Sequence, residues 1–323
     1  MKLVIVFLLM FSNLLFTQST MVVLCDKNDK LPIEYASIDF LNGYGIYSGE
    51  DGYIDYVILP EKFMVSHLNY KSQTLIKNEI KDTIFLELKE NFLDEVFVVK
   101  KNKIAKIGKE KIKKCNNHSD YQKSIVPSMG LEVCFYLENK ETFDIVLKSI
   151  QVPYINTSFE FKDKKQKLMV KDFNNLLKIT VYSVINGKPF EELKEMSMYK
   201  IINSNELRKD SFEIDFQDPI PLPNGGLFVS IKFIGRVDEY KNLILELPYE
   251  IVNYNGEVKK ISKNLMPLLP LEETESDISY LRYEFSNSKN WHTIDDYNFR
   301  NKNKETINKR LKVPIGYKIL LYK

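Results

Sequence analysis

The stretch that decides the fold runs from Leu31 to Val99, where short apolar segments alternate with turn residues. In order it reads Leu31-Pro32, Ala36-Ser37-Ile38-Asp39-Phe40, Glu50-Asp51-Gly52-Tyr53, Phe63-Met64-Val65-Ser66-His67-Leu68-Asn69-Tyr70, Thr83-Ile84-Phe85-Leu86 and Leu93-Asp94-Glu95-Val96-Phe97-Val98-Val99. Ala36, Ile38 and Phe40 alternate with polar neighbours, which is typical of a half-buried strand. Tight reversals that need positive φ are expected at four glycines: Gly43, Gly45, Gly49 and Gly52. This stretch therefore predicts one small β-sandwich.

The order of these motifs resembles the carboxypeptidase-like regulatory domain found at the N-termini of many cell-envelope proteins of the Bacteroidota. That family usually begins with a strand ending in Asp, here Val22-Val23-Leu24-Cys25-Asp26, and closes on a Leu-Asp-Glu-Val run. Two positions depart from the pattern: the glycine before the first strand is missing, and Asn69 replaces the Gly of a Gly-Tyr pair. The second departure is mild because Asn tolerates positive φ. Over residues 20–99 the resemblance implies a seven-stranded, transthyretin-like (prealbumin-like) β-sandwich, and it implies no peptidase activity.

Length and composition predict two globular domains. The chain has 323 residues, and domains usually hold about 100–200 residues each. Hydrophobic residues make up 44% of the chain, and Lys and Arg exceed Asp and Glu by only two charges. A net charge this small creates no global field that would recruit nucleic acid or an anionic membrane. We therefore predict no nucleic-acid partner.

The N-terminus has the pattern of a secretory signal peptide over residues 1–19. Lys2 precedes an apolar run from Leu3 to Phe16, and Thr17-Gln18-Ser19 supplies small residues near a cleavage site. The run is shorter than the ~20 residues that cross a bilayer, which favours cleavage over the alternative of an uncleaved anchor. The sequence thus predicts export to the periplasm, or to the outer membrane and cell surface, with no membrane span after cleavage.

The three cysteines leave two questions open. Cys25 follows the leader closely, but Leu24 stands where a lipoprotein signal places a small residue, so we interpret Cys25 as a strand residue and not as a lipidated one. Cys115 and Cys134 are compatible with a disulfide in an oxidising compartment or with free thiols, because sequence alone does not place their Cα atoms.

A lysine-rich segment, residues 100–114, follows the first domain. It contains eight lysines and one glutamate. A solvated linker between domains is favoured over a basic patch for lipid headgroups or polyanions, since no aromatic residues interleave for base stacking.

Residues 115–323 predict a second β-sandwich, similar to a jelly roll. Strand patterns are expected around Leu131–Leu137, Phe212–Phe216, Leu227–Phe233, Ser279–Phe285 and Val313–Tyr322. The shift of apolar parity near Phe143–Ile150 predicts a β-bulge, Asp218–Gly226 predicts a loop, and Asn186-Gly187 and Asn255-Gly256 predict hairpins. One short helix is expected at Lys304–Leu311.

This second region also resembles, less closely, the second domain of other Bacteroidota proteins with a carboxypeptidase-like regulatory domain. The matching segments are Val181-Tyr182-Ser183, Asn186-Gly187-Lys188-Pro189 and Gly226-Leu227-Phe228-Val229-Ser230-Ile231. The resemblance implies no known activity.

Motifs for catalysis are not found in the sequence. Zinc peptidases need at least three ligands at fixed spacing and a general base, whereas His67, His118 and His292 are widely separated and belong to no His-Glu-x-x-His motif. Nucleophile elbows, glycine-rich phosphate loops and Cys-x-x-Cys pairs do not occur either. We predict no catalytic, cofactor-binding or metal-binding residues and interpret the chain as a non-enzyme.

Two acidic clusters and one tryptophan keep alternatives open. Glu272–Asp277 and Asp295-Asp296 are interpreted as solvated segments; a calcium loop at the first is the alternative. Trp291 is interpreted as a core residue; a carbohydrate-stacking platform with Tyr283 or Tyr297 is the alternative. The sequence thus favours a non-catalytic binding or structural module with a protein or glycan partner in the cell envelope. A carbohydrate-binding module is the first alternative and a hydrolase with an unrecognised site the second.

Overall fold

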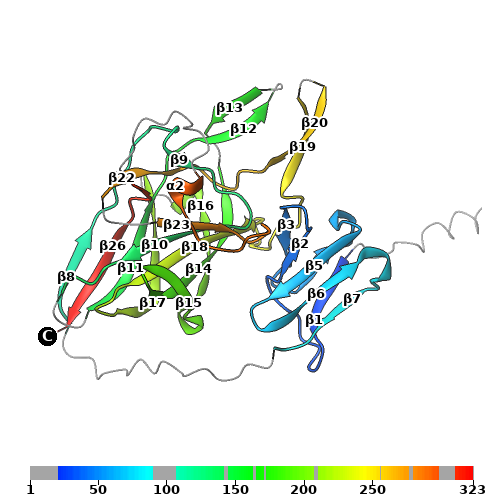
Figure 1. The fold of residues 1–323 in the computed structure, drawn as a ribbon, viewed down its shortest axis with the longest axis horizontal. Helices are drawn as coiled ribbons and strands as arrows, with labels where there is room; N and C mark the ends of the chain where they lie inside the picture. The colour runs from blue at the N-terminus through cyan, green and yellow to red at the C-terminus, as the bar shows by residue number, and fades with distance from the viewer. Residues whose placement is uncertain are drawn as a thin grey trace, which may run out of the picture.

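The computed structural model describes residues 21–89, 107–141, 145–162, 165–170, 172–206, 210–254, 256–275, 279–297 and 310–322. Within these ranges the chain is almost entirely β, and Figure 1 shows a small sandwich beside a larger one. The helical elements there are short: α2 (Ile294–Tyr297), η1 (Tyr56–Ile58), η2 (Lys77–Glu79), η3 (Lys194–Met196) and η4 (Ser204–Glu206). The predicted all-β architecture is confirmed. The predicted signal peptide (1–19) and the Leu-Asp-Glu-Val run lie outside the described residues.

The small sandwich contains seven strands in two sheets. One sheet has the order β4 (Tyr53–Asp55), β1 (Met21–Asp26), β7 (Thr83–Leu86), and the other has the order β3 (Gly45–Tyr47), β2 (Ser37–Asp39), β5 (Lys62–His67), β6 (Tyr70–Ile76). β1 is central in its sheet and pairs in parallel with β7. Leu24 of β1 and Phe63 of β5 are buried between the sheets. Cys25 is a buried residue of β1, as interpreted from the sequence.

Turn residues in the small sandwich follow the sequence prediction in part. Gly43 and Gly52 have φ of 84° and 74° and make the expected reversals. Gly45 instead lies inside β3, where its role is a close approach to the large sandwich. Asn69, in the β5–β6 turn, keeps a negative φ, so replacing Gly by Asn causes no backbone strain there.

The large sandwich also has two sheets. The seven-stranded sheet has the order β15 (Lys188–Glu192), β14 (Asn174–Ile185), β18 (Leu227–Arg236), β10 (Leu131–Leu137), β23 (Ser279–Tyr283), β24 (His292–Thr293), with β16 (Met198–Asn203) also pairing with β14. The four-stranded sheet has the order β17 (Ser211–Leu222), β11 (Ile145–Pro153), β26 (Gly316–Tyr322), β8 (Ile107–Lys113). The predicted bulge is present in β11, where the register shifts between Leu147 and Ser149. The predicted Asn186-Gly187 hairpin joins β14 to β15, with both residues at positive φ.

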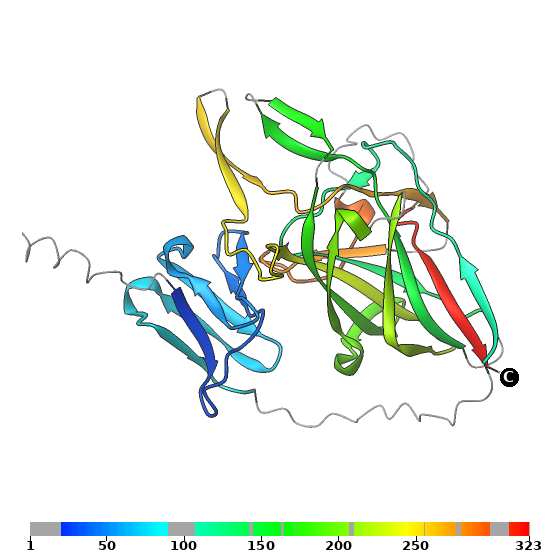
Figure 2. The same ribbon diagram turned by 180° about the vertical axis from the view of Figure 1, so that it is seen from behind.

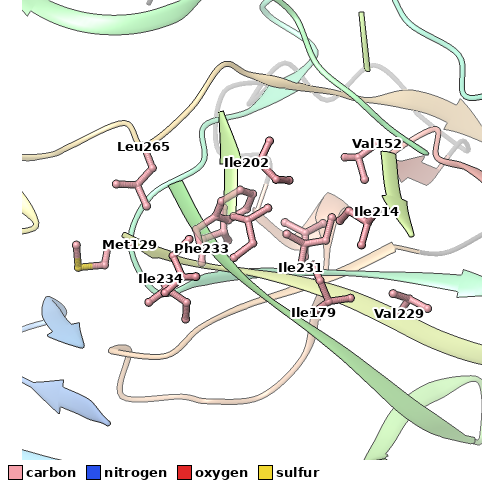
Figure 3. Close-up of a cluster of buried hydrophobic side chains, with 14 of the residues drawn as sticks. Met129, Val152, Ile179, Ile202, Ile214, Val229, Ile231, Phe233, Ile234 and Leu265 are labelled. Carbon is pink, nitrogen blue, oxygen red and sulfur yellow. The ribbon is translucent and has the colours of Figure 1, made fainter. Parts of the chain in front are cut away.

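The core of the large sandwich is built from alternate residues of facing strands. Ile179 of β14 and Ile231 of β18 point toward Val152 of β11 and Ile214 of β17 (Figure 3). All four are fully buried or nearly so. Most buried apolar side chains of the two sandwiches form one continuous cluster, so the two cores meet across the contact between the sandwiches.

The lysine-rich segment is the first place where the sequence interpretation was wrong. Residues 107–113 of the predicted linker (100–114) form β8, the edge strand of the four-stranded sheet, paired with β26. Lys109, Lys111 and Lys113 alternate with Glu110 and Ile112, which suits an edge strand because charged side chains there oppose pairing with other chains. The linker prediction for residues 100–106 lies outside the described residues.

The loop predicted at Asp218–Gly226 is also corrected, because β17 continues to Leu222. Its prolines are tolerated since β17 is an edge strand of its sheet, and Pro221 lies opposite Val146. The turn itself is restricted to the residues after Leu222, where the Gly226 N–H donates to the Pro223 carbonyl.

Smaller strand pairs complete the large domain. The hairpins β12 (Ser158–Lys162) with β13 (Lys165–Met169) and β19 (Tyr249–Tyr254) with β20 (Glu257–Ser262) project in the same direction (Figures 1 and 2). Two short pairs are β9 (Ser124–Ile125) with β21 (Leu269–Pro270) and β22 (Glu272–Thr274) with β25 (Arg310–Lys312). The helix predicted at Lys304–Leu311 is contradicted at its end, where Arg310 begins β25; residues 304–309 lie outside the described residues. No helix in the described ranges is both long and apolar enough to cross a membrane.

Candidate functional site

The outer face of the seven-stranded sheet, turned away from the large core, carries a layer of polar and aromatic side chains. In β10, Val133 and Phe135 point into the core, whereas Glu132 and Cys134 point to the outer face. Both outer residues are nevertheless 0% exposed. The small sandwich covers part of this face, with β3 against β18.

Glu132 is the centre of this layer. Its Oε1 accepts hydrogen bonds from Tyr182 Oη (2.8 Å) and Ser230 Oγ (2.6 Å). Its Oε2 accepts one from Arg282 Nε (2.8 Å) and lies 3.4 Å from Lys232 Nζ. The sheet register creates this arrangement, because Lys232 on β18 and Arg282 on β23 are the two cross-strand neighbours of Glu132. A carboxylate offers about four acceptor positions, so this one is saturated.

A second carboxylate completes the charge cluster, which we define as Glu132, Lys232, Arg282 and Glu284. Lys232 Nζ lies 3.0 Å from Glu284 Oε2 and therefore bridges the two carboxylates. Burial alone raises the pKa of Glu132, but the charges of Lys232 and Arg282 outweigh it and lower that pKa to about 2. The pKa of Glu284 is likewise lowered to about 2, against the effect of burial, by Lys232 and Lys289. Both groups stay ionised at neutral pH.

Trp291 lies at the border of the charge cluster. The Arg282 guanidinium stacks over its ring at 4.2 Å, and the Tyr182 ring meets it edge-on with centroids 5.5 Å apart. Arg282 also donates from Nη2 to Tyr182 Oη (2.8 Å). Trp291 thus packs against a partly buried cluster, and one of its faces is occupied by Arg282. Tyr283 packs against the main core, and the side chain of Tyr297 lies outside the described residues, so the proposed sugar platform is not assembled from Trp291 and Tyr283.

Phe285 joins the two sandwiches. One edge of its ring abuts Gly45 of β3 and the other abuts Gly130, the residue before β10, so that a Cβ at either glycine would overlap the ring. Gly130 also has φ of 81°, which disfavours other residues there. The Tyr47 ring lies beside Phe285 with centroids 5.4 Å apart. A single aromatic side chain is therefore held by a glycine from each sandwich.

Two tyrosine pairs extend the contact between the sandwiches. Tyr35 packs on Tyr199 of β16 with ring centroids 4.5 Å apart, and Tyr44 packs on Tyr249 of β19 at 4.7 Å. The Tyr44 hydroxyl also donates to the Lys260 carbonyl (3.4 Å). Aromatic pairs of this kind contribute about 0.5–1.5 kcal/mol each beyond their buried area, so the contact is specific as well as apolar.

The three histidines are not brought together. His67 lies in β5, where its Nδ1 accepts from the Asn69 N–H (3.4 Å) and its ring packs on Tyr70. Burial, followed by the positive charges of Lys178 and Lys89, lowers the pKa of His67 to about 4. His118 Nε2 contacts the Leu271 carbonyl (2.8 Å), and His292 belongs to β24. Among the described residues, no group of three His, Cys, Asp or Glu side chains is arranged to hold a metal ion.

The cysteines are all free in the structure. Cys134 is buried on the outer face of the seven-stranded sheet, packed with Phe228 and Tyr280. Cys115 is half-buried just after β8. Of the two alternatives for Cys115 and Cys134, the structure has free thiols.

The two acidic segments, Glu272–Asp277 and Asp295-Asp296, contribute residues to a strand, to ion pairs and to a hydrogen bond. The predicted solvated segment at Glu272–Asp277 begins as strand β22, which corrects that interpretation for residues 272–274. Glu272 accepts from Asn116 Nδ2 (3.0 Å) and pairs with Lys312, and Glu273 pairs with Lys123. Asp295 Oδ1 accepts from the Leu311 N–H. Residues 276–278 and the side chain of Asp296 lie outside the described residues.

Sequence reasoning missed the charge cluster. Three of its members alternate with apolar residues, in Leu131-Glu132-Val133, Ile231-Lys232-Phe233 and Leu281-Arg282-Tyr283, and this pattern is also that of a strand with one side in water. Opposite charges at cross-strand positions are a known means of stabilising a sheet. No family model, no curated protein and no solved structure matches the chain.

Proposed function

We propose that the chain is an exported, non-catalytic binding or structural module of the bacterial cell envelope, in which two sandwiches act as one rigid body. The N-terminal leader pattern and the motifs at residues 20–99 that resemble carboxypeptidase-like regulatory domains support the location. The Phe285 contact and the tyrosine pairs support the rigid coupling. The partner is a protein or glycan of the envelope.

The saturation of Glu132 is the observation that carries this proposal. Its four acceptor positions are occupied by groups of the same chain, and its side chain is 0% exposed. A buried, paired ion is costly to assemble and strongly destabilising to break. Such a group fixes the packing of strands and neighbouring domains and has no position left for a substrate.

A glycoside hydrolase needs a different arrangement of its carboxyl groups. Its two carboxyls lie about 5–10 Å apart across a cleft, and one has a raised pKa so that it acts as an acid. Glu132 and Glu284 are joined by Lys232, and the pKa of each is lowered to about 2. Neither carboxyl group therefore has a proton to donate at neutral pH.

The test combines a binding and a turnover measurement on the full mature chain. We expect the chain to bind members of an envelope glycan array, or to co-sediment saturably with envelope fractions, while releasing no product from glycan and peptide substrates. Glu284→Gln is the diagnostic variant, and Glu138→Gln, an exposed carboxylate paired with Lys140, is its control. Turnover that Glu284→Gln abolishes and Glu138→Gln preserves would overturn the proposal in favour of a hydrolase.

A further inference from the structure

The lysines of β8 share one face of an edge strand. The register places Lys111 opposite Ile319 of β26, and Ile319 opposite Leu147 of β11, whose side chain is buried in the core. Lys109 and Lys113, two residues away on either side, therefore lie on that same core-facing side of the sheet, about 7 Å from Lys111 along the strand. Of these three lysines, Lys111 is paired with Glu141 (2.5 Å), so Lys109 and Lys113 are the two at this edge that form no ion pair with a described residue.

A cavity of ≈ 40 Å³ opens beside the last of these lysines, between β8 and β26 on one side and β10 and β23 on the other. Lys113, Lys114 and Lys312 line it, Phe135 forms part of its apolar lining, and Glu272 is the one carboxylate among its described lining residues. This volume holds on the order of three water molecules, or one carboxylate or phosphate group.

The cavity has an excess of positive charge. Glu272 is already satisfied by Lys312 (3.4 Å) and Asn116 (3.0 Å). Lys113 lies over the Tyr317 ring at 5.4 Å, and neither Lys113 nor Lys114 forms an ion pair with a described residue.

The outer face of the same four-stranded sheet is different. There Lys148 pairs with Glu110 (3.4 Å) and Lys318 pairs with Glu213 (2.9 Å). The sheet thus pairs Lys148 and Lys318 with carboxylates on its outer face. On the cavity side Lys111 is paired with Glu141, whereas Lys109 and Lys113 form no ion pair with a described residue.

We propose that this cavity binds one anionic group, carboxylate or phosphate, of an acidic polysaccharide, and that Lys109 of β8 holds a further charge of the same polysaccharide chain. The proposal rests on the binding function above and names its ligand class. A linear chain with repeated charges reaches both the cavity and Lys109, because both lie along the same edge strand. A planar bilayer does not reach a recess between two sheets, and the Tyr317 ring is covered by Lys113, which disfavours base stacking by nucleic acid.

Edge protection is the competing explanation for the lysines of β8, since lysines on edge strands prevent pairing with other chains. That role requires neither the cavity nor Lys312. Edge protection predicts that anion binding depends only on the number of lysines. A binding site at the cavity predicts that it also depends on where those lysines lie.

The test measures affinity of the full mature chain for polygalacturonate, with neutral dextran as control, at low and high salt. We expect K113Q/K114Q to weaken binding by about tenfold or more and K113R/K114R to restore it. The matched control is K148Q/K318Q, which removes the same net charge from the other face and should change affinity by less than about twofold. E272Q should tighten binding. Inorganic phosphate competing more strongly than acetate identifies phosphate, and the reverse identifies carboxylate, as the preferred group.

Several results would overturn the inference. Equal loss in K113Q/K114Q and K148Q/K318Q would show unspecific attraction, and equal binding of dextran would show no role for charge. Tighter binding of duplex DNA or anionic vesicles, with the same dependence on Lys113 and Lys114, would assign the site to another ligand class. Saturable envelope binding that K113Q/K114Q leaves intact would refute this site while leaving the proposed function in place.

Discussion

In the centre of the seven-stranded sheet, at β10 and β18, both faces are buried, but by different means. The inner face presents Phe135 and Ile231 to the four-stranded sheet and needs only apolar contact. The outer face presents Glu132 and Lys232, which are buried because they are paired and because the small sandwich lies nearby. An apolar core tolerates substitutions that conserve volume, whereas a paired charge tolerates no loss of its partner. The outer face therefore depends on its ion pairs in a way that the inner face does not.

Removing the central charge should have the largest effect. Glu132→Gln keeps the shape of the side chain but leaves Lys232 and Arg282 without their shared carboxylate, so the free energy of unfolding should fall by about 3–5 kcal/mol. Denaturant unfolding followed by circular dichroism measures this. Glu138→Gln, on an exposed side chain, should change it by less than about 0.5 kcal/mol. If Glu132→Gln lowered the free energy of unfolding as little as Glu138→Gln does, the outer face would not depend on its charges for stability.

Lowering the pH should remove the stabilisation that the charge cluster gives to the outer face of the seven-stranded sheet, whereas the apolar contacts of the inner face do not titrate. Glu132 and Glu284 have folded-state pKa values lowered to about 2 from an ordinary 4.5. Their stabilisation is complete above about pH 4.5 and is lost as the pH falls toward 2, because the unfolded chain takes up protons first. Each group contributes roughly 3 kcal/mol over that window. The free energy of unfolding, measured from pH 5 to pH 2, should show this decline, and Glu132→Gln should show a shallower one. Equal dependence on pH in the two proteins would contradict the role given to Glu132.

The contact between the sandwiches gives an intermediate effect. Gly45→Ala places a methyl group against the Phe285 ring and should lower the free energy of unfolding by about 1–3 kcal/mol. Adding Phe285→Leu should recover only the part of that loss that comes from the ring, because the methyl group also lies against the Ile38 carbonyl oxygen. Gly225→Ala is the matched control, since no atom lies within 4 Å of a Cβ at that position. A Gly45→Ala melting curve that coincides with the control would show that the ring is free to move.

The smallest predicted effect comes from His67. Its pKa is lowered to about 4, so protonation between pH 6.5 and 4 favours the unfolded chain and the free energy of unfolding should rise with pH across that window. The rise should be about 1 kcal/mol, discounted for partial exposure. His67→Gln should flatten it while leaving the acid decline below pH 4.5 unchanged. A rise that persists in His67→Gln would place its origin elsewhere.

Alternation of apolar residues predicted the inner faces of both sandwiches but not the outer face. The pattern of Leu131, Val133 and Phe135 predicts a strand whose other side meets water, and Glu132 fits that interpretation until the small sandwich is placed. Burial of Glu132 is caused by contacts between segments far apart in the sequence, which local periodicity does not encode.

Edge strands were the other source of error. The lysines of residues 107–113 and the prolines at 219 and 221 are usually signs of linkers and loops, yet both segments are strands. Each lies at the border of a sheet, where charge and missing N–H groups are tolerated because one side of the strand is unpaired. Whether a segment lies at an edge is a property of the topology, which the sequence pattern did not reveal.

Phe285, Gly45 and Gly130 form a unit whose members are not free to vary separately. A larger residue at either glycine is compatible with the fold only if the ring at position 285 becomes smaller in the same lineage. Among chains descended from a common ancestor, these three positions should consequently change together, even though they lie in three distant parts of the sequence.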